Sequence, residues 1–138
     1  MKKSIYKVRV EWGNCDPAKI VFYPNYFAWF DSATHRLFES VGCSLAVLAE
    51  KYGVAGFPLV EAKASFMSPS VVGDELAIES YIETWNRRSF AVSHTVFNKD
   101  KIALKGSEIR AGLPPISWTP PKVDNTEIGG RDVRAKTT

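Results

Sequence analysis

The sequence is short of the features that mark several specialised classes of protein. Its two cysteines, Cys15 and Cys43, are too few for a disulfide framework, so we expect free thiols. With only two histidines to join them, and no ligand spacing, neither a metal site nor a cofactor is expected. No stretch approaches the roughly eighteen apolar residues of a membrane-spanning helix. Internal repeats and low-complexity segments are also missing.

A strong excess of charge is lacking as well. Eighteen Lys and Arg residues against fifteen Asp and Glu residues leave a formal net charge of +3. This mild and scattered charge argues against a nucleic-acid partner, but it leaves acidic small molecules open as ligands. The basic start, residues 1–3, is followed by charged residues that interrupt the apolar core a signal peptide would need. We therefore expect a cytoplasmic protein without a membrane partner.

The residues that are present suit one globular domain with a substantial core. Of the 138 residues, 45% are hydrophobic and 12% are aromatic. We expect this domain to span residues 1–121 and a polar, mobile tail to cover residues 122–138. Four prolines lie within residues 112–121, and they would be hard to accommodate in a central strand.

A long amphipathic helix is predicted from Pro24 to about Val41. Proline suits the first helical turn, and Gly42 supplies the left-handed residue that often ends a helix. At about 100° per residue, the large apolar side chains share one broad face. They are Tyr26, Phe27, Trp29, Phe30, Ala33, Leu37, Phe38 and Val41. A face this wide and this aromatic is expected to be buried.

Alternating apolar side chains predict about five strands around this helix. One strand precedes the helix, over residues 4–12, and a short second helix capped by Ser44 follows it. The remaining strands follow one another at residues 59–66, 76–82, 90–96 and 102–109. His94, on an apolar strand face, is expected to be a hydrogen-bonded core residue. This order predicts an α+β fold in which a single curved antiparallel sheet wraps one helix.

The start of the long helix is the stretch best suited to chemistry. The first N–H groups of a helix have no internal partner and can polarise a carbonyl group or hold an anion. Asp16 lies in a tight loop eight residues before Pro24. A carboxylate beside such a helix end is the minimum equipment for hydrolysing an acyl compound. The position of Asp16 in the sequence, taken alone, also fits a turn residue whose side chain only stabilises the loop.

Several motifs resemble those of one enzyme family. They include Asp16-Pro17-Ala18, Ile20-Val21, Tyr23-Pro24-Asn25-Tyr26, Trp29 with Asp31, Ala64-Ser65-Phe66, Trp85 with Arg87, Ser89-Phe90 and Glu108-Ile109-Arg110. Over roughly residues 4–111 the chain resembles the hotdog-fold acyl-CoA thioesterases, especially the subgroup that acts on 4-hydroxybenzoyl-CoA. The resemblance implies a hotdog fold and hydrolysis of an aromatic acyl-CoA to the free acid and CoA.

The resemblance also implies two catalytic residues. Asp16 matches the carboxylate that attacks the thioester carbon or activates a water molecule, and the sequence leaves both open. Tyr23 matches the residue whose backbone N–H polarises the thioester carbonyl. Related short-chain enzymes commonly have a histidine just before this helix, where this chain has Tyr23-Pro24. That difference favours the aromatic subgroup.

Five further residues are expected to bind the substrate. Arg87, Arg88 and Ser89 match positions that contact the nucleotide end of CoA, whose phosphates suit a guanidinium group. Asp31 either belongs to an exposed ion pair on the helix surface or lies close to the site. Phe57 stands where the 4-hydroxybenzoyl subgroup has a threonine near the active site, so the acyl group of the substrate stays open.

The open edges of the predicted sheet lead us to expect a homodimer or homotetramer, with sites shared between subunits. Other functions remain possible for this fold. The substrate could carry a short or medium aliphatic acyl group, or be a thioester of an acyl carrier protein. A non-catalytic acyl-CoA-binding regulator is a further alternative, but it would need an output segment for which we expect no room in 138 residues.

Overall fold

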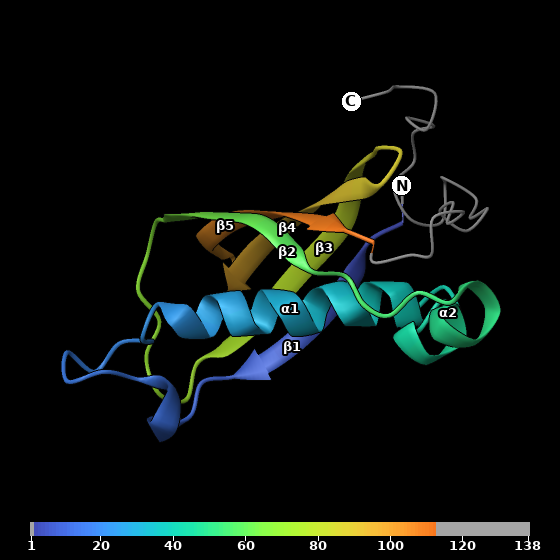
Figure 1. Cartoon of the computed structure of the whole chain (residues 1–138). Helices are drawn as coiled ribbons and strands as arrows, with labels where there is room; N and C mark the ends of the chain where they lie inside the picture. Colours follow the sequence, from blue (N-terminus) through green and yellow to red (C-terminus); the bar gives the residue numbers. More distant parts are fainter. Residues whose placement is uncertain (1, 113–138) are drawn as a thin grey trace.

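The computed structural model describes residues 2–112 of the chain. Its elements are β1 (Ser4–Arg9), α1 (Pro24–Glu39), α2 (Leu45–Tyr52), β2 (Leu59–Phe66), β3 (Glu75–Trp85), β4 (Ser89–Asn98) and β5 (Lys101–Ala111). The five strands form one antiparallel sheet in the order β1-β3-β4-β5-β2. Helix α1 lies across one face of this sheet, and α2 packs near its C-terminal end (Figure 1). The predicted α+β fold is therefore confirmed. Both the tail and most of the proline-rich segment lie outside the described residues.

Helix α1 has 16 residues, two fewer than predicted. It begins at Pro24, and the residue that turns the chain away beyond its end is Gly42, with φ of +75°. The buried side chains of the helix are Tyr26, Phe30, Ala33, Thr34, Leu37 and Phe38. All but Thr34 belong to the predicted apolar face. The helix therefore buries its aromatic stripe against the sheet, as the 3.6-residue period requires.

The core consists of two clusters, one beneath each half of α1. The cluster under the N-terminal half contains Val10, Val21, Tyr26, Phe30, Ala33, Leu76, Ile78, Val96, Ala103 and Leu104. The cluster under the C-terminal half, which also holds α2, contains Leu37, Phe38, Leu48, Val54, Phe57, Ile82, Trp85, Phe90 and Val92. Together the two clusters pack against α1 along its whole length. Both ends of the helix therefore have fixed positions relative to the sheet.

Strand β2 was predicted at residues 59–66, and the structure confirms its position. It lies at the edge of the sheet and pairs only with β5, with an irregularity between Leu59 and Glu61. Val60 is 64% exposed and Phe66 is 54% exposed, although both belong to the apolar residues that alternate with polar ones along this strand. An alternating sequence pattern distinguishes the two faces of a strand, but it does not reveal whether another helix or strand covers either face. These side chains are therefore exposed despite the pattern. An apolar edge strand of this kind is open to pairing with a second chain.

Trp12 was predicted to continue the first strand on its buried side, and this prediction is wrong. Strand β1 ends at Arg9, and Trp12 lies in a 3₁₀ turn, where it is 77% exposed. The turn is stabilised locally, because the Glu11 N–H donates a 2.8 Å hydrogen bond to Asn14 Oδ1. A side chain that bonds its own backbone competes with strand pairing.

Candidate active site

Asp16 is held in a closed loop. An antiparallel bridge joins the two ends of the loop, residues 15–21, and the Asp16 N–H donates to the Ile20 carbonyl oxygen at 3.0 Å. The Ala18 N–H donates a hydrogen bond to Asp16 Oδ1 at 2.8 Å. This bond fixes the carboxylate but does not involve its second oxygen, Oδ2. Lys19 adopts φ of +67°, a left-handed conformation that the tight turn requires.

Tyr23 immediately precedes α1 and offers an open backbone donor. The neighbouring N–H groups are occupied: Phe22 donates to Asn14 at 2.8 Å, and Asn25 donates to Phe22 at 2.9 Å. No described residue accepts a hydrogen bond from the Tyr23 N–H. Pro24 has no N–H, so it contributes no competing donor. The open N–H lies at the positive end of the helix dipole, where it can bind an oxygen atom that is gaining negative charge.

Asp16 and Tyr23 line one cavity of about 460 Å³. Its other walls are Ile20, Val21, Tyr26, Phe66, Met67, Ser68, Pro69 and Ser70. The volume and the mainly apolar walls are typical of sites for small organic ligands. Burial raises the pKa of Tyr26, and a hydrogen bond from Ser70 opposes that shift only in part. The phenol therefore stays neutral at physiological pH, and the carboxylate of Asp16 is the group here suited to nucleophilic or base chemistry.

The residues predicted to bind the nucleotide lie elsewhere in the chain. Arg87 and Arg88 lie in the bend between β3 and β4, where both are exposed, and Ser89 is the first residue of β4. The bend is tied together by a hydrogen bond from Asn86 Nδ2 to Ser89 Oγ at 3.3 Å. It adjoins the core cluster beneath the C-terminal half of α1, whereas the cavity adjoins the opposite end of this helix. One chain alone does not bring Asp16 to these arginines.

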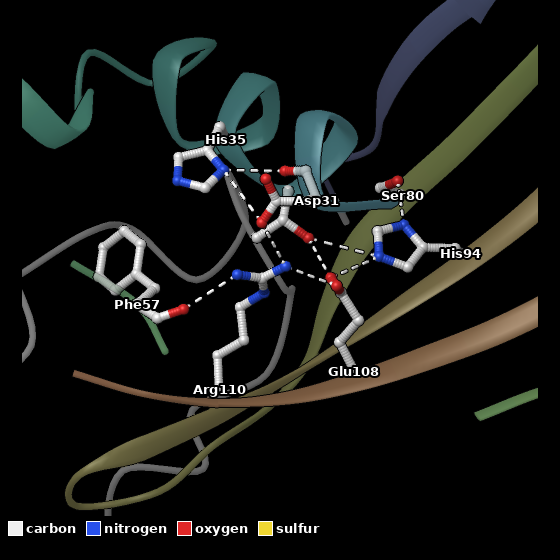
Figure 2. Close-up of polar contacts among 8 residues, drawn as sticks. Asp31, His35, Phe57, Ser80, His94, Glu108 and Arg110 are labelled. Carbon is white, nitrogen blue, oxygen red and sulfur yellow. Dashed lines mark hydrogen bonds and ion pairs between the residues drawn. The ribbon is translucent and has the colours of Figure 1, made fainter. Parts of the chain in front are cut away.

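Asp31 and Phe57 meet a residue to which sequence analysis gave no role, namely Arg110 (Figure 2). Arg110 Nη2 donates to Asp31 Oδ1 at 2.8 Å, and Arg110 Nη1 donates to the Phe57 carbonyl oxygen at 2.9 Å. The expected pair on the helix surface also exists, with 3.8 Å between His35 Nδ1 and Asp31 Oδ1. Neither Asp31 nor Phe57 lines the cavity of Asp16.

Arg110 belongs to a buried polar cluster with Glu108, His94 and Thr34. Glu108 Oε2 accepts from Arg110 Nη2 at 2.6 Å, and Glu108 Oε1 lies 2.9 Å from His94 Nε2. Burial alone would raise the pKa of Glu108, but hydrogen bonds with His94, Arg110 and Thr34 outweigh it and hold the pKa at about 2. The same neighbours confirm the prediction that His94 is a satisfied core residue. Strand alternation, which puts Glu108 and Arg110 on the inward face with Leu104, was the available signal for this cluster.

These features define a class of protein. A single helix is wrapped by a curved antiparallel sheet, and a fixed carboxylate shares a cavity with an open N–H at the start of that helix. This is an enzyme of the hotdog fold, with a site suited to acyl compounds. Over the described residues, no helix is long and apolar enough to cross a membrane. The same residues contain no group of three or more side chains able to hold a metal ion.

The chain belongs to the thioesterase superfamily, whose family model matches residues 18–104. It is 36% identical to the 4-hydroxybenzoyl-CoA thioesterase of Pseudomonas sp. (strain CBS-3), over 80% of this chain and 83% of that protein. A solved gentisyl-coenzyme A thioesterase superposes with a TM-score of 0.75 at 34% identity, over 82% of this chain and 92% of that chain. A mutant 4-hydroxybenzoyl-CoA thioesterase complexed with 4-hydroxybenzoyl-CoA gives 0.77 at 32% identity, over 81% and 84%. The protein is thus a thioester hydrolase.

Proposed function

We propose that this protein hydrolyses an aromatic acyl-CoA thioester to the free acid and CoA. The observation that carries the proposal is the cavity shared by the Asp16 carboxylate and the open Tyr23 N–H. Two similar proteins, named for 4-hydroxybenzoyl-CoA and gentisyl-CoA, act on hydroxylated aromatic acyl groups, which supports the same substrate class here. A cytoplasmic location is part of this proposal.

The chemistry assigns one task to each of the two residues. The thioester carbonyl oxygen accepts a hydrogen bond from the Tyr23 N–H, which stabilises the negative charge that develops there. Asp16 supplies the other half of the reaction in one of two ways. Its carboxylate oxygen attacks the carbonyl carbon and expels the CoA thiolate, leaving an anhydride that water then hydrolyses. Alternatively, it takes a proton from a water molecule that attacks directly.

A second copy of the chain would complete this site. Phe66 and Met67 line the cavity and belong to or follow the edge strand β2, yet they are 54% and 55% exposed. A partner that pairs along β2 would cover these side chains and add walls to the cavity. We propose that such a dimer, alone or within a tetramer, brings Arg87 and Arg88 of one chain towards the cavity of the other, where they bind the CoA phosphates with help from Ser89.

Of the remaining two candidate residues, Asp31 lies on α1, and Phe57 lies in the segment before β2 and packs against the C-terminal half of this helix. Asp31 is proposed to contact the far end of the acyl group. Phe57 is buried, with 6% of its surface exposed, and its ring packs 4.9 Å from the ring of Phe38 between centroids. Its part in substrate binding is therefore indirect, through its carbonyl oxygen, which holds Arg110.

The test is a panel of aromatic and aliphatic acyl-CoAs, with release of the CoA thiol as the signal. The proposal expects the highest kcat/KM for a hydroxylated benzoyl-CoA. A preference for short or medium aliphatic acyl-CoAs would mean that the proposed substrate is wrong, although the reaction, hydrolysis of an acyl-CoA, would be right. Tight binding of acyl-CoAs without hydrolysis of any of them would favour a binding regulator instead.

A further inference from the structure

Asn25, the second residue of α1, is bonded to both halves of the candidate active site. Its backbone N–H donates to the Phe22 carbonyl oxygen at 2.9 Å, and its side-chain Nδ2 donates to the Asn14 carbonyl oxygen at 2.8 Å. Phe22 directly precedes Tyr23, which carries the open N–H. Asn14 lies two residues before Asp16. One residue therefore joins the start of the helix to the segment that leads into the loop of the carboxylate.

The backbone bond of Asn25 fixes the direction of the open donor. The Phe22 carbonyl group and the Tyr23 N–H belong to one planar peptide unit, in which the C=O and N–H bonds point in opposite directions. Asn25 holds the carbonyl end of this unit towards the helix. The N–H end therefore points away from the helix, with the other free donors of its first turn.

The Asn14 carbonyl oxygen is the anchor shared by the loop and the helix. It accepts two hydrogen bonds, from the Phe22 N–H at 2.8 Å and from Asn25 Nδ2 at 2.8 Å. A carbonyl oxygen has two lone pairs, so the capacity of this acceptor is fully used. The two donors flank Tyr23 in the sequence, one residue before it and two after it. The peptide with the open N–H is therefore held from both sides to a point two residues from Asp16.

The side chain of Asn25 does not act as an ordinary helix cap. A capping asparagine uses its oxygen to accept a hydrogen bond from an N–H group of the first turn. Asn25 instead donates through Nδ2 to a carbonyl oxygen eleven residues earlier in the chain. Asparagine is also a poorer helix former than alanine, so the residue is not explained by helix propensity. What its side chain supplies is the link between the helix and the loop.

We infer that Asn25 is a positioning residue that sets the direction and the distance of the Tyr23 N–H relative to the Asp16 carboxylate. This inference rests on the proposed function and deepens it, because that reaction needs both groups at one thioester at the same time. The N–H must meet the carbonyl oxygen while the carboxylate, or the water it activates, meets the carbonyl carbon. A displacement of about 1 Å in such an arrangement can cost a factor of about 100 in rate.

The first experiment measures kcat and KM of Asn25→Ala on 4-hydroxybenzoyl-CoA. The change removes Nδ2 but keeps the backbone N–H, so only the link to Asn14 is lost. We expect kcat to fall by about 10- to 100-fold, because a displaced N–H stabilises the developing negative charge less well. KM should stay within about twofold of the wild-type value, since the contacts that bind the ground state remain. The midpoint of urea unfolding should change little, because the helix propensity of alanine offsets the lost bond.

Ser40→Ala is the matched control. Ser40 Oγ donates to the Leu37 carbonyl oxygen at 2.6 Å, at the C-terminal end of the same helix. The change therefore removes the same kind of bond, from a side chain to a backbone oxygen, at the end remote from the site. It should leave kcat and KM as in the wild type. If Ser40→Ala lowers kcat as much as Asn25→Ala does, the loss reflects general destabilisation of α1 and the inference is overturned.

Asn25→Asp covers the case in which Asn25→Ala does not fold. It keeps the size of the side chain and puts a negative charge in the first turn of α1, where such a charge favours the helix, so the variant should fold. Its carboxylate has no N–H to donate to the Asn14 carbonyl oxygen. We expect kcat to fall in this variant too, and a folded Asn25→Asp protein with wild-type kcat overturns the inference.

A second measurement does not depend on turnover. Residual dipolar couplings report the orientation of single N–H bonds, and here they would be compared for Tyr23 and for Ala18, whose N–H is bonded to Asp16 Oδ1. In Asn25→Ala the orientation of the Tyr23 N–H relative to the Ala18 N–H should change, whereas Ser40→Ala should leave it unchanged. That result supports the inference even if the protein hydrolyses no acyl-CoA and the proposed function fails. The same orientation in Asn25→Ala as in the wild type overturns the inference, even if acyl-CoAs are hydrolysed.

Discussion

The ring of Phe30 occupies the space that a Cβ atom at residue 106 would need. A Cβ built on Gly106 would overlap Phe30 Cε2 and lie 2.7 Å from Cζ. The ring cannot move freely, because it is stacked on His94 with 4.5 Å between centroids and 5° between planes. Glycine at residue 106 thus allows an aromatic side chain of α1 to reach β5, above the buried polar cluster.

Gly106→Ala should destabilise the fold by about 1–3 kcal/mol, the usual cost of overpacking a core. Phe30→Leu should also destabilise the protein, because it removes ring contacts. The double variant should cost clearly less than the sum of the two, since each change relieves the other. Urea unfolding measures all three, and Gly56→Ala is the control, because a Cβ there meets nothing within 4 Å. Strictly additive losses would show that the overlap is removed by other movements.

The protein should lose stability in acid through Glu108. Its pKa in the folded state is about 2, below the ordinary value of 4.5, so the folded state favours the charged form. The resulting stabilisation, about 3 kcal/mol, is present above pH 4.5 and is lost as the pH falls towards 2. The difference in unfolding free energy between the wild type and Glu108→Gln should therefore shrink over this range.

Asp74 provides a control for that experiment. Hydrogen bonds from the Val71 N–H and from Asn98 also lower the pKa of Asp74, but its side chain lies nearer the surface. The difference in unfolding free energy between the wild type and Asp74→Asn should also shrink as the pH falls, but by a smaller amount. A constant difference between the wild type and Glu108→Gln from pH 6 to pH 2 would contradict the assignment to Glu108.

The parts of the fold that could be predicted are those that depend on residues close together in the sequence. The helix from Pro24 and the loop of Asp16 lie within about two dozen residues, so period and turn chemistry identify both. The exposure of Trp12 and Val60 was not predictable, since it depends on where a strand ends and which strand lies at the edge. The contact between Asp31 and Arg110 joins residues 79 apart, and only the register of the folded sheet brings them together.

The basic bend should matter for binding rather than for catalysis. Replacing Arg87 and Arg88 with alanine should raise KM for an acyl-CoA and leave kcat nearly unchanged, because lost phosphate contacts weaken ground state and transition state alike. The effect should be largest at low salt. Lys51→Ala with Lys105→Ala removes the same charge from exposed positions elsewhere and should have little effect. An equal rise in KM for an acyl-pantetheine, which lacks the nucleotide, would assign the arginines another role.

The chain should assemble through β2. Light scattering at micromolar concentration should give two or four times the 15.4 kDa of a single chain. Val60→Lys puts a charge on the exposed apolar edge and should shift the mass towards that of the monomer while lowering activity. Ile5→Lys is the control, because Ile5 is 60% exposed on β1 at the opposite edge of the sheet. A monomeric wild type would remove the basis for a site shared between chains.

Asp16 should be essential for turnover but not for folding or binding. Asp16→Asn keeps the size of the side chain and an oxygen that can accept the Ala18 N–H bond, so the loop should persist. Loss of the charge removes both the nucleophile and the base, and kcat should fall by at least about 100-fold. Circular dichroism and calorimetry with a non-hydrolysable analogue should match the wild type. If Asp16 only shaped the loop, folding and binding would suffer as much as turnover, and a folded variant with wild-type kcat would exclude Asp16 from the chemistry.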